Sequence, residues 1–137
     1  MLGCALSPSG NAALPPSLSD DRAADLLAAM LDNIEDVEGY VAGLERDAFE
    51  QDELVRDAVE RCLERVCEAV ARLGEQVPPL LTEQRRDNVG GLGDRLRHAR
   101  QRISADVVWG VLSQDLPGLK LAAALALARL QGATDDG

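Results

Sequence analysis

The sequence is poor in aromatic side chains, with only Tyr40, Phe49 and Trp109 among its 137 residues. Apolar residues still make up 46% of the chain, which is enough to build one core. That core must consist mainly of leucine, valine and alanine. These residues suit closely packed helices better than β-sheets, which favour aromatic and β-branched side chains. The composition therefore predicts an all-α protein of one domain.

The chain also lacks the excess positive charge that is typical of proteins that coat nucleic acid. It has 14 lysines and arginines against 24 aspartates and glutamates, so its net charge is −10. Bulk attraction to a phosphate backbone needs a basic surface. The balance therefore argues against a general nucleic-acid coat and against an anionic membrane surface as a partner, but it leaves room for a local basic site.

Cysteines are few and irregularly spaced. Cys4, Cys62 and Cys67 form neither an even set nor a CxxC pair, so they predict neither a disulfide framework nor a zinc site. We interpret Cys62 and Cys67 as small buried hydrophobic residues in a reducing cytoplasm. Residues 119–130 are apolar but short, and two basic residues interrupt them, so we expect no membrane span.

Residues 1–19 carry no charged side chain and predict a disordered N-terminal tail, followed by a helical domain at 20–130 and a disordered C-terminal tail at 131–137. Within the domain, apolar residues at steps of three and four predict two long helices, ending near Gly43 and at Gly74. A short link at residues 47–51 separates these two helices.

Pro78 and Pro79 interrupt the helical pattern, and residues 74–88 are predicted to form a connector. A third helix should follow through about residue 101. Ser104 should cap a fourth helix, which Pro117 should kink or break before a last helical segment. Four or five helices with short connections predict an antiparallel bundle.

One window of the sequence has the opposite charge. Residues 85–102 hold six arginines against two aspartates, a local net charge of +4, and they include the only histidine, His98. Neighbouring guanidinium groups disfavour the protonated imidazole, so we expect His98 to be neutral at pH 7 and able to accept a proton. Guanidinium groups can hold a phosphate. Together these groups are a minimal set for cleaving RNA without a metal.

Other interpretations of these features remain open. Arginines on helices are more often solvated, or bind an acidic partner, than catalytic. The glycines of residues 90–93 would suit a phosphate cradle, but no predicted strand precedes them and the Lys-Ser/Thr of a P-loop is missing. The carboxylates of the first two helices could in principle hold a metal in a bundle. We interpret them as a solvated face, and we predict no metal site and no cofactor.

Four segments resemble, in the correct order, the HepT-like branch of the HEPN family. Residues 56–69 resemble its second-helix signature, in which an arginine, a Leu-Glu pair and a Glu-Ala pair recur at these spacings. Residues 95–98 resemble the segment that ends in the family's histidine. Residues 104–109 and 115–120 resemble its closing helix, with the tryptophan and the Asp-Leu-Pro both in place. The resemblance covers residues 21–121.

The resemblance implies a HEPN-like helical bundle that works as a homodimer. In this family two histidine motifs face each other across the dimer and cleave RNA without metal. Many members are toxins, whose antitoxin is commonly a minimal nucleotidyltransferase encoded alongside, which in some cases adenylylates a tyrosine just after the histidine. The implied catalytic residue is His98 as general base or acid, assisted by Asp94 in the polar position of the motif.

Two positions depart from the family motif. Gly93 stands where the motif has its arginine, and Arg100 stands where it often has a tyrosine. One interpretation keeps the ribonuclease: Arg95 supplies the missing charge at the catalytic site, and the remaining basic side chains bind RNA, namely Arg97, Arg100 and Arg102. The other interpretation is a catalytically degenerate HEPN protein that acts as a dimeric module for binding a partner or a nucleotide.

Overall fold

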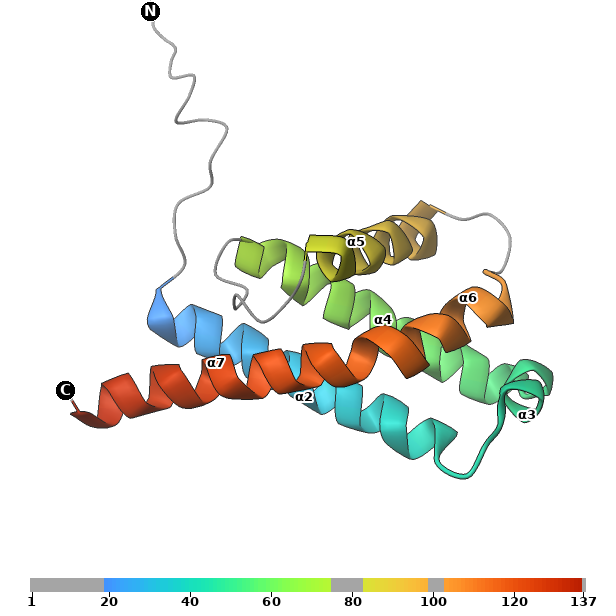
Figure 1. Ribbon diagram of the computed structural model, residues 1–137, viewed down its shortest axis with the longest axis horizontal. Helices are drawn as coiled ribbons and strands as arrows, with labels where there is room; N and C mark the ends of the chain where they lie inside the picture. The colour runs from blue at the N-terminus through green and yellow to red at the C-terminus, as the bar shows by residue number, and fades with distance from the viewer. Residues whose placement is uncertain (1–18, 75–82, 99–102, 137) are drawn as a thin grey trace, which may run out of the picture.

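The computed structural model describes residues 19–74, 83–98 and 103–136, so residues 1–18 of the predicted tail lie outside the described part. No strand occurs in the described ranges, and the all-α prediction is confirmed. The long helices alternate in direction, so the domain is an antiparallel bundle (Figure 1). The elements in chain order are α2 (Asp20–Val41), α3 (Arg46–Gln51), α4 (Glu53–Leu73), α5 (Glu83–His98), α6 (Ala105–Gly110), the π-helical turn η2 (Val111–Asp115) and α7 (Leu116–Asp136).

Helices α2 and α4 pack against each other and form the base of the core. Both begin where the sequence predicts. The backbone N–H of Arg22 donates to Ser19 Oγ at 3.2 Å, and that of Val55 donates to Asp52 Oδ1 at 3.1 Å, which satisfies otherwise unpaired N–H groups. One apolar stripe of each helix is buried. Leu54, which shares the spacing of the α4 stripe, is 83% exposed because it lies in the first turn, outside the core.

The predicted link after α2 is instead a short helix, α3. Phe49 is fully buried there, and its ring lies 5.3 Å from the ring of Trp109 on α6, measured between centroids. Arg46 at the start of α3 binds Asp106 on α6 as well as the nearby carboxylates of Asp47 and Glu50. Burial of Phe49 and the ion pairs of Arg46 hold this segment against α6, which local sequence propensity does not reveal.

The predicted connector is also too long, because α5 begins at Glu83 and contains the glycines of residues 90–93 within the helix. Val89 and Leu92 are buried, and α5 packs along α4. Burial of this face outweighs the low helix propensity of glycine, about 1 kcal/mol per residue relative to alanine. Backbone amides inside a helix bond to preceding carbonyls, so the glycines do not form a phosphate cradle.

Pro117 does not break the last helix. Helix α6, the turn η2 and α7 form one continuous helix, in which the π-helical turn directly precedes Leu116 and Pro117. Proline lacks an N–H, and in an α-helix its ring would collide with the carbonyl four residues earlier. The wider turn accommodates the ring without ending the helix. Helix α7 then continues to Asp136, beyond the predicted domain boundary at residue 130.

This continuous helix is longer than the apolar run that the sequence suggested. By length and composition alone, the stretch Ala105–Gly132 could cross a membrane, since an 18-residue window in it has a mean hydropathy of 1.2. The core helix of a soluble protein passes the same test. Here Val108 and Leu119 are buried in the core, and Lys120 Nζ donates to Glu38 Oε1 on α2 at 2.8 Å. These contacts place the stretch in the bundle.

Cys62 and Cys67 are buried on α4, as predicted. Burial raises the pKa of the Cys67 thiol from its ordinary value of 9.0 to about 12 in the folded protein. Below pH 9 the thiol is neutral in both the folded and the unfolded state, so its burial does not lower stability. Between pH 9 and 12 the thiol ionises only in the unfolded chain, which stabilises the unfolded state. We expect the free energy of unfolding to fall by about 1.4 kcal/mol per pH unit in that window. Urea denaturation at pH 8 and pH 10 should show this loss, and Cys67→Ala should remove most of it. An unchanged slope in Cys67→Ala would contradict the assignment.

Candidate active site

His98 is the last residue of α5, and its side chain is exposed. Arg95 precedes it by three residues and Asp94 by four, so these side chains lie on one helix face. Both are also exposed. The structure thus brings the three predicted catalytic residues together on one face at the end of α5. Their catalytic roles stay predictions.

The basic residues of this helix end differ in their contacts. Arg97 Nη2 donates to Asp94 Oδ1 at 2.8 Å, so these two charges neutralise each other. Because both side chains are largely exposed, the pair contributes less than about 1 kcal/mol to stability. Within the described residues no contact holds the Arg95 guanidinium. Arg95 is therefore the cation that is available to an anionic ligand, whereas Arg100 and Arg102 lie outside the described residues.

Gly93, at the position of the family's motif arginine, faces the core. A Cβ atom built on Gly93 would lie 2.9 Å from the Cβ of Cys67 on α4, closer than real Cβ atoms approach. Since the Cys67 Cβ is fixed to the α4 backbone, a larger residue at position 93 would push the two helices apart. An arginine at this position cannot reach a ligand without rearrangement of α5 on α4.

We expect Gly93→Ala to destabilise the protein, even though alanine favours helices. Overpacking typically costs about 1–3 kcal/mol. Gly90→Ala is the matched control, because it lies on the same helix with nothing within 4 Å of its added Cβ. That variant should gain roughly 0.5–1 kcal/mol from helix propensity. Urea denaturation should therefore rank Gly93→Ala below wild type and Gly90→Ala above it. Equal stabilities would contradict the close approach of the two helices.

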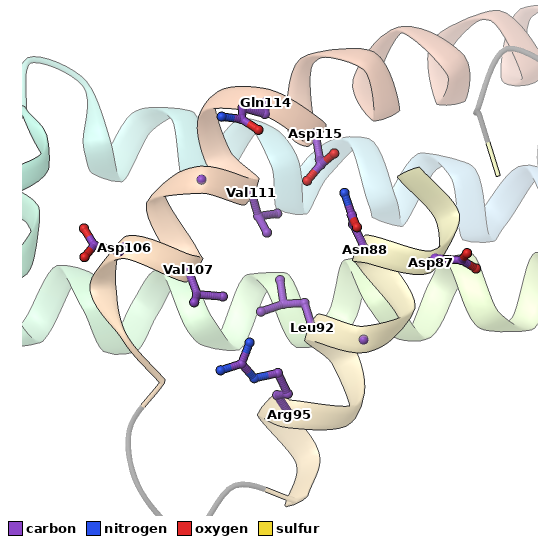
Figure 2. A pocket seen from close by; sticks show the side chains of 11 residues that line it. Asp87, Asn88, Leu92, Arg95, Asp106, Val107, Val111, Gln114 and Asp115 are labelled. Carbon is purple, nitrogen blue, oxygen red and sulfur yellow. The ribbon is translucent and has the colours of Figure 1, made fainter. Parts of the chain in front are cut away.

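A groove of about 390 Å³ lies beside this helix face, between α5 and the segment formed by α6 and η2 (Figure 2). One end is polar: Asn88 and Asp115 point toward each other from opposite sides, near Gln114. Leu92, Val107 and Val111 form the apolar middle. Arg95 extends across the other end toward α6. Two further carboxylates line the groove: Asp87, next to Asn88 on α5, and Asp106 on α6, which is paired with Arg46. The groove therefore joins hydrogen-bonding groups, an apolar surface, carboxylates and one cation.

Asp115 is the only buried polar or charged residue among the described residues, with 8% of its surface exposed. It comes from the π-helical turn, and such turns occur frequently at functional sites. Asp115 already has a partner within the protein. A carboxylate offers about four lone-pair sites, so it can still accept hydrogen bonds from a ligand.

Arg56 on α4 holds the start of α6 against the corner between α3 and α4. Its Nη2 donates to the Ile103 carbonyl at 3.0 Å, and its Nη1 donates to the Glu50 carbonyl at 3.4 Å. Ile103 immediately precedes Ser104, whose Oγ accepts from the Asp106 N–H at 3.1 Å and caps α6. Arg56 thus fixes the start of α6, and with it one wall of the groove, to the corner between α3 and α4.

Apart from Arg95, the sequence alone did not identify the residues that line the groove, nor the structural role of Arg56. Arg56 and the Asp-Leu-Pro segment did stand out in the family resemblance, but the resemblance assigns them no contacts. Within the described residues no group of three or more His, Cys, Asp or Glu side chains lies close enough to hold a metal ion.

The comparison with known families agrees with this geometry. The sequence model of the HepT-like family, whose description is "Ribonuclease HepT-like", matches residues 30–125. The match covers more than half of the chain. The matched part includes α4, α5 and the start of α7, and therefore the whole groove and His98. No solved structure matches the chain. The chain belongs to the HepT-like ribonuclease family, within the HEPN superfamily.

Proposed function

We propose that the protein is the toxin of a HEPN/nucleotidyltransferase toxin–antitoxin pair and acts as a metal-independent endoribonuclease. The observation that carries this proposal is the shared exposed face of α5, where His98 stands one helical turn from Arg95, which has no partner among the described residues. Arg95 also extends across one end of the open groove (Figure 2), and His98 follows it by three residues on the same helix.

In this proposal RNA supplies its own nucleophile. The imidazole of His98 takes the proton of a ribose 2′-hydroxyl, the 2′-oxygen attacks the adjacent phosphorus, and the bond from phosphorus to the 5′-oxygen breaks. The products are a 2′,3′-cyclic phosphate and a free 5′-hydroxyl, whose proton comes from a general acid. Arg95 stabilises the charge that develops on the phosphoryl oxygens. A homodimer would bring a second His98 to act as that acid.

Membership of the family supports three further parts of the proposal. We propose that the protein is a cytoplasmic homodimer and that its antitoxin is a minimal nucleotidyltransferase. Sedimentation of the purified protein should give twice the mass of one chain. A small nucleotidyltransferase in the neighbouring reading frame would support the pairing, and co-purification of the two proteins would test it directly.

The test of the reaction uses purified protein and single-stranded RNA in the presence of EDTA. We expect shortened fragments that end in a 2′,3′-cyclic phosphate, and we expect growth arrest when the protein is expressed without an antitoxin. A preparation that leaves the RNA intact at high enzyme concentration would rule out the ribonuclease.

The second candidate is a degenerate HEPN protein that binds a partner or a nucleotide without cleavage. The contact between Gly93 and Cys67 favours it, because it prevents position 93 from carrying the motif arginine. Loss of one group that stabilises developing charge typically costs about 2.7–4 kcal/mol of transition-state stabilisation. This candidate predicts no growth arrest. The double variant Gly93→Arg/Arg100→Tyr would not be a clean test of regained activity, because of the clash at Cys67.

A further inference from the structure

We propose that the groove between α5 and the segment α6–η2 is a nucleotide subsite that selects guanine, next to the cleaved phosphate. This inference rests on the proposed ribonuclease function and names the base that the site recognises. The groove volume of about 390 Å³ lies within the range of roughly 300–1,000 Å³ that is usual for ligand pockets.

The order of chemical groups along the groove matches the order of parts in a nucleotide. The polar end, with Asn88, Gln114 and Asp115, suits the hydrogen-bonding edge of a base (Figure 2). The apolar middle suits the face of the base ring. Arg95 at the far end suits the phosphate, and His98 follows Arg95 by three residues on the same helix. A nucleotide bound in this direction would place its phosphate beside the imidazole.

A nucleotide bound in the opposite direction, with its phosphate at the polar end of the groove, is unfavourable. A phosphate at the polar end would meet the buried carboxylate of Asp115, and two negative charges in a partly buried site repel each other. The base would then contact Arg95 and leave the polar end without a ligand. Asp87 lies next to Asn88 on the same helix and adds negative charge to that end, whereas the charge of Asp106 on α6 is balanced by Arg46. These charges favour a ligand with its base edge toward η2 and its phosphate toward Arg95.

Guanine complements the polar end better than the other bases. Its N1–H and N2–H₂ groups are adjacent donors, which a single carboxylate such as Asp115 can accept in parallel. Its O6 and N7 atoms are acceptors, to which the amide group of Asn88 can donate, whereas Gln114, like Asp115, already has a partner within the protein. Uracil presents two carbonyl oxygens and one N–H on that edge, so it would place an acceptor against the carboxylate. Single-stranded RNA is commonly read in this way on the edges of unstacked bases.

Two glycines keep the groove open. Gly91 on α5 and Gly110 on α6 line it from opposite sides, and a Cβ built on either meets nothing within 4 Å. Side chains at these positions would project into the space that the base requires. Gly90 precedes Gly91 on the same helix, is equally unobstructed and does not line the groove. Substitutions at Gly91 and Gly90 can therefore be compared directly, because only Gly91 lines the groove.

The binding test uses guanosine 3′-monophosphate with uridine 3′-monophosphate as the competitor base, and it does not depend on cleavage. Because the chain has a single histidine, the imidazole signals of His98 report by NMR on a phosphate that arrives nearby. We expect at least a fivefold preference for the guanine nucleotide, in line with the discrimination of a good bidentate contact. Gly91→Leu should abolish binding, and Gly90→Leu should bind as wild type does. Equal affinity for both nucleotides, no binding, or equal behaviour of the two leucine variants would overturn the proposal.

The cleavage test separates this inference from the proposed function. Oligonucleotides with a single guanosine, inosine, adenosine, cytidine or uridine at the variable position are incubated with wild-type protein. The RNA should be cut on the 3′ side of guanosine. The rate of cleavage should fall several-fold when inosine, which lacks the N2 amino group, takes its place. Cleavage without base preference overturns the guanine subsite and leaves the ribonuclease intact. Guanine-specific binding without any cleavage supports the subsite and overturns the ribonuclease.

Discussion

His98→Ala should lower the rate of RNA cleavage by about 10²–10⁴-fold, the usual contribution of a positioned general acid or base. The chain contains no other histidine, so no second imidazole can replace it within the protomer. In a homodimer the same substitution removes both imidazoles of the paired sites. The measurement is the initial rate of cleavage of a single-stranded RNA by purified protein with EDTA present.

The controls for this variant separate chemistry from folding. His98 is exposed at the end of α5, so the free energy of unfolding of His98→Ala should lie within about 0.5 kcal/mol of wild type. Free imidazole should restore part of the lost rate, because the exposed position is open to solvent. Gly90→Ala should cleave as fast as wild type. Equal cleavage by His98→Ala and wild type would remove His98 from the mechanism.

Arg56→Met should destabilise the protein by roughly 2–4 kcal/mol. A hydrogen bond from a charged group contributes about 1.5–3 kcal/mol, and a buried acceptor is costly to leave unpaired. Methionine retains the apolar part of the side chain but cannot donate to the carbonyls of Ile103 and Glu50. Ile103 is only 5% exposed, so water would not easily replace the guanidinium. The midpoint of urea denaturation measures the loss.

The matched control is Arg61→Met on the same helix, where the arginine is exposed. Its stability should change by no more than about 0.5 kcal/mol. Arg56→Lys should fall between the two, because one ammonium cannot reach both carbonyls as a planar guanidinium does. If Arg56→Met and Arg61→Met unfold at the same urea concentration, Arg56 does not hold the corner between α3, α4 and α6.

The helices with strong apolar periodicity and local caps were predictable from the sequence. The starts of α2 at Ser19 and α6 at Ser104 depend on side-chain oxygens that accept neighbouring N–H groups, and a sequence shows these directly. The errors lie where tertiary contacts outweigh local propensity. Phe49 is buried against Trp109, so a predicted link is a helix. Packing of α5 on α4 likewise keeps three glycines helical.

The candidate site was predictable only in part. The charge reversal around His98 and the family resemblance identified the end of α5. Neither could show that Asp94 pairs with Arg97 while Arg95 stays available, because the sequence fixes helix spacing but not side-chain direction. The groove could not be predicted at all. It requires Gly91 and Asp115, far apart in sequence, to meet across two helices.

The π-helical turn η2 holds one residue more than the same stretch of α-helix would, because its hydrogen bonds join residues five apart. Deletion of one residue from Val111–Asp115 would therefore restore an ordinary α-helix and leave α7 in its present rotation, with Leu119 in the core and Lys120 beside Glu38. The cost of that deletion would fall on Pro117, whose ring would meet the carbonyl four residues earlier. Insertion of a further residue would instead turn α7 by about 100° relative to α6 and move Leu119 out of the core. Functional variants should therefore tolerate neither change in the length of this segment, each for a different reason.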